Sequence, residues 1–291
     1  MTNPLLSPTR VRAALRSLEL RPTRGMGQNF LIDPLPLAQI IAAAQLTPTD
    51  LVVEVGPGLG VLTWELLQRC ARVVAVELDR RLADRLPETL HGLGTLQIIQ
   101  GDVLNLSPAL LLRAEATTSY KLVANLPYAI TGAVLRHFLE ATPRPTMIVV
   151  LVQWEVAERI VAKPGALSML AHSVQVYAAP EIVARVGAQS FLPAPAVDSA
   201  ILRLQIRPQP LLEDAEIPPV FQIMKAGFLQ ARKQLGNALP TGLAALGYRV
   251  ERTAILEALE RAGVAAMRRA ETVTLAEWYR IYQALGPSEK R

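Results

Sequence analysis

Short apolar runs alternate with amphipathic helical patterns through the first half of the chain. The apolar runs are rich in Val, Ile and Leu and are predicted strands over 50–55, 72–78, 95–100, 120–125 and 145–153. Helical patterns lie between them over 61–70, 80–90 and 131–140. Continuously apolar strands that alternate with helices are typical of parallel sheets covered on both faces. The alternation therefore predicts an α/β fold with a doubly wound sheet.

The second half of the chain departs from this alternation. Residues 181–187 and 199–206 are strand-like with only a loop between them, which predicts an antiparallel hairpin at the sheet edge. The next segment, 207–219, is rich in proline and acidic residues and is typical of a linker. Only helical patterns follow, over 220–238, 251–262 and 274–284. The sequence thus predicts a first domain over 1–207 and a small all-α C-terminal domain over 208–291.

The composition restricts the class of protein. Hydrophobic residues make up 51% of the 291 residues, which is enough for a sizeable core. The single cysteine, Cys70, excludes a disulfide framework within the chain. The histidines share no metal-ligand spacing with it, so no metal site is expected. Neither a signal peptide nor an uninterrupted apolar run of membrane-spanning length is recognisable. These features predict a cytoplasmic protein without a membrane partner.

The net charge of +5 is unevenly distributed. Residues 1–30 carry a net charge of +4, residues 31–205 one of −2, and residues 206–291 one of +3. A basic N-terminal arm and a basic tail around a nearly neutral middle indicate a polyanionic partner. The alternative is that these arginines only solubilise exposed helices.

A glycine-rich turn, EVGPGLG, follows the first predicted strand at 54–60. Gly56 and Gly58 permit a tight turn and let a ligand approach the backbone. Glu77 ends the second strand, where a carboxylate can accept both hydroxyls of a ribose, unless it is only a surface charge. Asp102 follows the third strand and can accept a hydrogen bond from an adenine amine. Together they predict a site for an adenosine-containing ligand. NAD and S-adenosylmethionine both fit, and the G-x-G-x-G spacing favours the second.

The fourth strand ends in the tetrapeptide NLPY, 125–128. The side-chain oxygen of Asn125 and a nearby backbone carbonyl can together accept the hydrogens of an exocyclic amine. They would bring the amine towards a tetrahedral state, which frees its lone pair for methylation. Tyr128 offers a face on which a base can stack, and Pro127 stiffens the turn. These residues suit methyl transfer to an amine on a planar base, whereas the alternative is a simple turn.

The order of the motifs resembles the ribosomal RNA adenine dimethyltransferase family, most closely its bacterial small-subunit branch. The motifs are GQNFL (27–31), EVGPGLGVLT (54–63), ELD (77–79), GDVL (101–104), NLPY (125–128) and FLPAPAVDSAILRL (191–204). A basic segment, AGFLQARKQLGNAL (226–239), is similar to the basic helix of the family's tail. The resemblance covers about residues 20–240 and implies a Rossmann-like methyltransferase sheet.

The resemblance also implies roles for individual residues. It implies cofactor contacts for Asn29, Leu31, Gly56, Gly58, Glu77, Asp102 and Asn125. It implies catalytic or target-binding positions at Asn125, Leu126, Tyr128 and Phe191. Glu77 would bind the ribose and Asp102 the adenine of S-adenosylmethionine. Phe191 would stack on the target adenine opposite Tyr128, and the alternatives for it are a core aromatic or a loop anchor.

The function that the resemblance implies is S-adenosylmethionine-dependent dimethylation of two adjacent adenosines in small-subunit (16S) ribosomal RNA. The partner would be the immature small ribosomal subunit, and we expect a monomer. The arm and the tail domain would hold RNA through phosphate contacts, Arg232 and Lys233 among them. Three alternatives stay open: a large-subunit dimethyltransferase linked to antibiotic resistance, a non-catalytic RNA-binding assembly factor, and a DNA adenine methyltransferase. The first more often has N-I-P-Y, and the last usually has an acidic first residue there.

Two departures from the family pattern lie towards the expected RNA side. The family usually has Gln-Lys-Glu after the fifth strand, whereas this chain has Gln153, Trp154 and Glu155. The loop that follows AKPG, 162–165, is also shorter than usual. Both departures bear on RNA contacts rather than on the methyl chemistry.

Overall fold

The computed structural model describes residues 3–20, 29–113 and 119–286. The chain divides into two compact units: unit 1 is Met1–Glu158 with Ala179–Arg207, and unit 2 is Arg159–Ala178 with Pro208–Arg291. The boundary at 207/208 coincides with the end of the predicted first domain. Residues 159–178, which the sequence placed in that first domain, belong instead to unit 2.

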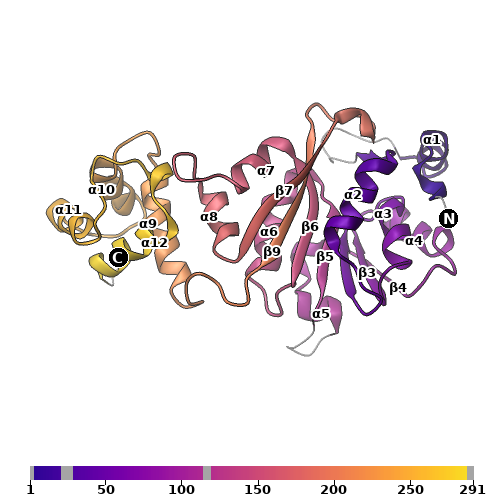
Figure 1. Ribbon diagram of the computed structural model, residues 1–291, viewed down its shortest axis with the longest axis horizontal. Helices are drawn as coiled ribbons and strands as arrows, with labels where there is room; N and C mark the ends of the chain where they lie inside the picture. The colour runs from indigo at the N-terminus through magenta and orange to yellow at the C-terminus, as the bar shows by residue number, and fades with distance from the viewer. Residues whose placement is uncertain (1–2, 21–28, 114–118, 287–291) are drawn as a thin grey trace. The chain divides into compact units, whose positions relative to one another are not determined.

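A seven-stranded sheet forms the centre of unit 1, in the order β4-β3-β2-β5-β6-β9-β7 (Figure 1). Its strands are β2 (Leu51–Val55), β3 (Arg72–Glu77), β4 (Leu96–Gln100), β5 (Lys121–Asn125), β6 (Met147–Gln153), β7 (Ala178–Val186) and β9 (Ser199–Ile206). Strands β2 to β6 are parallel, and β9 runs antiparallel to β6. The predicted doubly wound α/β sheet is confirmed.

The direction of winding reverses between β2 and β5. From β2 the chain moves outward through β3 to β4, and then returns to the other side of β2 with β5. Ligands of such sheets bind in the crevice at the carboxyl ends of the strands, at this switch point. The glycine-rich turn follows β2 and the NLPY segment follows β5, so the topology brings both to the same crevice.

The last two strands lie at the sheet edge, as predicted. β9 pairs with β6 in register from Met147 opposite Gln205 to Gln153 opposite Ser199, and β7 is outermost. β6 is buried along almost its whole length, whereas half-buried and exposed residues alternate along β7 because only one of its faces is covered. A second, two-stranded sheet joins β1 (Phe30–Leu31) to β8 (Phe191–Leu192). In the sequence, β8 follows β7 and precedes β9.

Helices cover the sheet of unit 1 (Figure 1). They are α1 (Pro8–Ser17), α2 (Pro34–Ala44), α3 (Val61–Leu67), α4 (Arg80–Thr89), α5 (Pro108–Leu112), α6 (Thr131–Leu139) and the start of α7 (Trp154–Ile160). Short 3-10 turns are Pro4–Leu6, Val103–Asn105, Tyr128–Ile130, Ala188–Ser190 and, in unit 2, Ala270–Thr272. Helix α1 buries Val11 and Leu15 in a cluster with Phe30, Leu59 and Leu82, next to the glycine-rich turn.

Unit 2 is helical in the part that the structure describes. It contains α8 (Met169–Gln175), α9 (Ile217–Phe228), α10 (Leu235–Ala245), α11 (Arg252–Arg261) and α12 (Leu275–Leu285). The prediction of one helix over 220–238 is wrong, because α9 ends at Phe228 and α10 begins at Leu235. Gln234 forms an antiparallel bridge with Arg269, and the Leu235 N–H donates to the carbonyl of Arg268. Pairing with a distant segment therefore overrides the helical propensity of this stretch.

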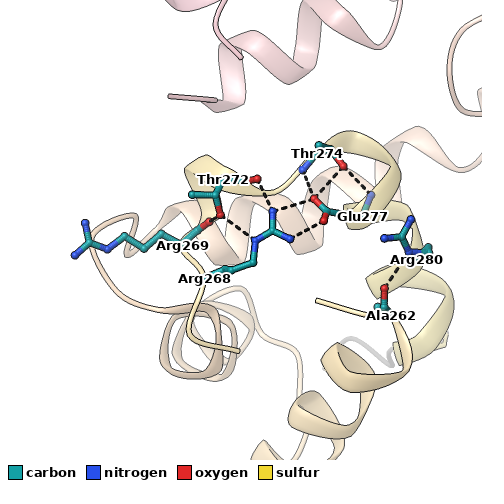
Figure 2. A network of polar contacts seen from close by, with 7 residues as sticks. All are labelled: Ala262, Arg268, Arg269, Thr272, Thr274, Glu277 and Arg280. Atoms are coloured by element: carbon teal, nitrogen blue, oxygen red, sulfur yellow. Dashed lines mark hydrogen bonds and ion pairs between the residues drawn. The ribbon is translucent and has the colours of Figure 1, made fainter. Parts of the chain in front are cut away.

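A network of polar contacts fixes the segment before α12 (Figure 2). The Arg268 guanidinium donates to both carboxylate oxygens of Glu277, at 2.5 and 3.1 Å, and to the carbonyl of Thr272 at 2.5 Å. The same carboxylate accepts from the Thr274 N–H at 2.8 Å, which forms a capping box at the start of α12. Arg268 holds the pKa of Glu277 down at about 2.

Across the described ranges, none of the helices has the length and apolar character needed to cross a membrane. Within the same ranges, no group of three or more His, Cys, Asp or Glu side chains is placed to hold a metal ion.

Candidate active site

A cavity of about 470 Å³ opens at the carboxyl ends of β2, β3, β4 and β5. Its walls come from residues 29–31, the glycine-rich turn and the start of α3, residues 76–79 and 101–103 after β3 and β4, and residues 125–130 after β5. This volume lies in the range of small-molecule and cofactor sites. Nine of the ten residues predicted for the site line it: Asn29, Leu31, Gly56, Gly58, Glu77, Asp102, Asn125, Leu126 and Tyr128.

The glycine-rich turn needs its glycines for two separate reasons. Gly56 and Gly58 have φ values of +67° and +58°, which are strained for residues with a side chain. A Cβ on Gly58 would also come within 3.2 Å of the Phe30 ring. The turn can therefore present bare backbone to the cavity while Phe30 packs directly against it.

Glu77 lies at the end of β3 with only 5% of its surface exposed. One carboxylate oxygen accepts from the Gly58 N–H and the other from the Asp79 N–H, both at 3.0 Å. Burial raises the pKa of Glu77, and the two backbone donors partly offset this effect. The contacts orient the carboxylate in the cavity wall, and each oxygen keeps a lone pair for a further donor.

Asp102 follows β4 and is exposed at the cavity wall. One of its carboxylate oxygens accepts from the Leu104 N–H at 3.0 Å and caps a short 3-10 turn. This contact holds the side chain at the strand end, where the sequence predicted an acceptor.

The NLPY segment lies beside the glycine-rich turn. The Asn125 amide nitrogen donates to the backbone carbonyl of Asn29 at 3.1 Å. Since a carbonyl can only accept, this contact determines which end of the amide is the nitrogen. The Tyr128 hydroxyl is 2.7 Å from that of Ser199, the first residue of β9, and burial raises the pKa of Tyr128. Leu126 is buried, and its N–H donates to Leu151 on β6 at 3.2 Å.

Phe191 differs from the other nine residues. It pairs with Leu31 across the β1–β8 ladder, is only 2% exposed and packs in the main hydrophobic core of unit 1. It does not line the cavity. In this structure its surroundings are those of a core aromatic, which was one of the alternatives from the sequence.

Glu54 lines the cavity and was not singled out from the sequence. It is the acidic residue of β2 that comes two positions before Gly56, and its side chain is 1% exposed. Its Oε2 has no hydrogen-bond partner, and burial, with a smaller contribution from the nearby Glu77, raises its pKa to about 8. An acidic residue inside an otherwise apolar strand was the signal that could have identified it.

Comparison with known proteins agrees with this geometry. The sequence profile of the family described as "Ribosomal RNA adenine dimethylase" matches residues 21–286. The "Ribosomal RNA small subunit methyltransferase A" of Dehalococcoides mccartyi is 46% identical over 262 residues, which cover 90% of this chain and 88% of that protein. The protein of the same name from Pelotomaculum thermopropionicum is 42% identical over 281 residues, covering 94% of each chain.

Two solved structures are also similar. The crystal structure of the 23S rRNA methyltransferase ErmE superposes with a TM-score of 0.68 at 31% identity, over 88% of this chain and 99% of that one. A dimethyladenosine transferase from Plasmodium falciparum has a TM-score of 0.72 at 24% identity, over 87% of this chain and 95% of that one, and shares the fold. The chain belongs to the ribosomal RNA adenine dimethylase family and is an S-adenosylmethionine-dependent adenine dimethyltransferase.

Proposed function

We propose that this enzyme dimethylates the exocyclic amines of two adjacent adenosines in small-subunit ribosomal RNA, acting on the immature subunit. The observation that carries the chemistry is the placement of Asn125 and Tyr128 in the same cavity as the glycine-rich turn and Glu77. A cofactor site and a site for a planar base thus share one crevice, which in-line methyl transfer requires.

The cavity fits S-adenosylmethionine, which supplies an electrophilic methyl group on a sulfonium when bound. Bare backbone at Gly56 and Gly58 leaves room for its amino-acid part. We propose that Glu77 accepts the ribose hydroxyls, since its buried carboxylate lies in the cavity wall, and that Asp102 accepts from the adenine amine. Glu54 adds a second buried acid, and a cationic ligand would favour its ionised form.

Asn125 would act on the target amine. Its amide nitrogen donates to the Asn29 carbonyl, which leaves the amide oxygen to accept hydrogen bonds from the target amine. An acceptor beside the amine draws its hydrogens out of the ring plane and frees the nitrogen lone pair. No side-chain base is needed, because the product ammonium is acidic enough to lose its proton to water. Tyr128, with its hydroxyl anchored by Ser199, would present its ring for stacking.

The small subunit is favoured over the large subunit by the degree of similarity. The small-subunit methyltransferases of D. mccartyi and P. thermopropionicum are 46% and 42% identical to this chain, whereas the large-subunit enzyme ErmE is 31% identical. Leu126 also matches N-L-P-Y rather than the N-I-P-Y that is more frequent in the large-subunit branch. A non-catalytic assembly factor would not need the buried acids of the cavity.

The role of Phe191 stays a prediction. Its ring is buried in the hydrophobic core of unit 1, so stacking on a target adenine would require that ring to be uncovered when RNA binds. Replacing Phe191 by Leu separates the two roles. A core role predicts reduced stability with normal methylation per folded molecule, whereas a stacking role predicts a weakened methylation rate.

Single-turnover methylation of immature small subunits tests the proposal. Asn125→Ala should lower the rate about 100-fold or more, comparable to the loss of one preorganised polar group at a reacting centre. Tyr128→Ala should weaken target engagement by about 1–3 kcal/mol, while Tyr128→Phe keeps much of the activity. Rates are normalised to the folded fraction by circular dichroism, and the modified nucleoside is identified after digestion.

Two outcomes would contradict the proposal. If folded Asn125→Ala protein methylates at the wild-type rate, NLPY is only a turn. If large but not small subunits yield dimethyladenosine, the chain belongs to the other branch.

A further inference from the structure

A planar cluster lies at the carboxyl end of β6, outside the residues of the cavity wall. The guanidinium carbon of Arg185, on β7, is 4.6 Å from the centre of the Trp154 ring at the start of α7. Trp154 is half-buried, and 58% of the Arg185 side chain is exposed. The guanidinium therefore lies over the indole ring while much of the Arg185 side chain stays accessible to solvent.

Asp198 holds this stack in place. One of its carboxylate oxygens accepts from two nitrogens of Arg185, Nε and Nη2, each at 2.9 Å. Its other oxygen accepts from the Ala188 N–H at 3.1 Å, and its backbone carbonyl accepts from the Trp154 N–H at 2.9 Å. The guanidinium is thus oriented before any ligand binds, which lowers the entropy lost on binding.

The stack is connected to the candidate target site through β9. Asp198 precedes Ser199, whose hydroxyl is 2.7 Å from that of Tyr128. Ser199 is also opposite Gln153 in the ladder of β6 and β9, one residue before Trp154. The aromatic ring proposed to hold the target adenine and the Trp154–Arg185 stack are therefore anchored at neighbouring positions of one strand end.

The charge of the cluster indicates what it can bind. The ion pair with Asp198 neutralises most of the positive charge of Arg185, so attraction for phosphate is weak. A flat guanidinium face backed by an indole favours stacking with another planar group instead. Unpaired RNA bases stack on aromatic and arginine planes, and each such contact contributes about 1–3 kcal/mol.

We propose that the Trp154–Arg185 stack binds the base of a nucleotide next to the target adenosine and so positions the RNA. The inference rests on the proposed function, because it assumes an RNA substrate at Tyr128. It gives a purpose to Trp154, which occupies the position where the family usually has lysine. Trp154 and Arg185 are positioning residues here, and neither takes part in methyl transfer.

The test uses small subunits reconstituted with ribosomal RNA in which one nucleotide beside the target adenosines at a time is abasic. With wild-type enzyme, one abasic position should raise the KM for subunits about tenfold without changing kcat. Arg185→Ala and Trp154→Ala should raise the KM about as much on intact RNA. They should show no further increase at that abasic position, because the contact is already lost.

The matched control is Arg203→Ala. Arg203 on β9 forms a comparable ion pair with Glu181 on β7, at 2.6 Å, but lies away from the strand end. This variant should leave the KM unchanged. Arg185→Lys keeps the charge and removes the planar face, so it should behave like the alanine variant, whereas a phosphate contact would survive in it.

Two results overturn the inference. One is an unchanged KM for intact subunits in the Trp154 and Arg185 variants. The other is an abasic nucleotide that raises the KM equally in the wild-type enzyme and in these variants. Circular dichroism and S-adenosylmethionine affinity, both expected to be normal, exclude misfolding. Failure of the proposed function has a different signature, namely that wild-type enzyme produces no dimethyladenosine on intact small subunits.

Discussion

Unit 1 and unit 2 differ in how they accommodate acidic side chains. In unit 1 two acids, Glu54 and Glu77, lie at the cavity, and the pKa of each is raised by burial. Glu54 has an oxygen without a partner, and the contacts of Glu77 are two backbone N–H groups. In unit 2 the acid Glu277 is paired with Arg268, and its pKa is lowered to about 2 (Figure 2).

The comparison separates residues that serve a ligand from residues that serve the fold. Buried unpartnered atoms also occur in unit 2, at His172, Gln230 and Trp278, but none of these is an acid at the cavity wall. Burial lowers the pKa of His172 to about 4, which keeps it neutral. An acid that is buried without a counter-ion has a raised pKa and costs stability when it ionises, so two such acids at one cavity mark a candidate ligand site.

The largest effect should come from Glu77→Ala. This variant removes a charged acceptor from the proposed ribose site, and we expect S-adenosylmethionine affinity to fall by about 1.5–3 kcal/mol. Titration calorimetry measures it, and Glu277→Ala in unit 2 serves as the control that should bind the cofactor normally. Unchanged affinity in Glu77→Ala would break the distinction between the two units. Comparable binding of NAD would contradict the cofactor assignment.

Glu54 should make unit 1 sensitive to alkaline pH. Its pKa in the folded protein is about 8, above the ordinary value of 4.5, so folding favours the protonated form. This contribution to stability is complete below about pH 4.5 and is lost as the pH rises through about 8. Glu54→Gln cannot ionise, so its free energy of unfolding relative to wild type should rise between about pH 5 and about pH 9, by at least about 1 kcal/mol, which denaturant unfolding at each pH measures. Parallel pH profiles would mean that Glu54 is solvated.

Arg268→Ala should instead weaken unit 2. The variant leaves Glu277 without its counter-ion, and we expect a loss of about 1–2 kcal/mol in the free energy of unfolding, since the pair is partly exposed. Because the pKa of Glu277 lies at about 2, below the ordinary 4.5, the difference should be present above about pH 4.5 and disappear as the pH falls towards 2. Denaturant unfolding measures it.

The control for Arg268→Ala is Arg80→Ala, which removes an exposed pair with Asp84 on α4. It should change stability very little. A loss of cofactor affinity in Arg268→Ala, with normal stability, would contradict the view that this network serves only the fold.

Much of unit 1 could be predicted from the sequence, for a physical reason. The central strands are buried on both faces, so each appears as a continuous apolar run, as in β6. Parallel strands end at one edge, so Gly56, Glu77, Asp102 and Asn125 could be assigned to one site without knowledge of the helices. Glu54 was missed because it lies within a strand rather than after one.

The features that were not predicted depend on contacts between distant segments. β1 and β8 have two residues each and exist because Phe30 and Leu31 pair with Leu192 and Phe191. The same ladder buries Phe191. The grouping of residues 159–178 with unit 2 likewise depends on packing, and the backbone N–H groups of Gly165 and Leu167 both donate to the carbonyl of Glu271. None of these pairings leaves a periodic pattern in the sequence.

The smallest expected effect concerns the exposed basic residues of unit 2. Arg232 and Lys233 were predicted on a helix but lie in the turn between α9 and α10, close in sequence to the bridge of Gln234 with Arg269. Arg232, Lys233 and Arg269 are all exposed. A turn held by that bridge can present the three basic side chains together to RNA. Replacing Arg232 and Lys233 by alanine should reduce the salt dependence of RNA binding by up to about two phosphate contacts, without changing the methylation rate at saturating RNA.

The comparison variant replaces Arg252 and Arg261, at the two ends of α11, which carry the same charge on another part of the unit. If the turn is the contact, only the first pair changes the slope of log affinity against log salt concentration. Equal changes in both variants would mean that the unit acts through its net charge, without a defined contact. An unchanged slope in both would mean that the basic side chains of unit 2 only solubilise it, and the division of labour between the units would then hold for the cavity alone.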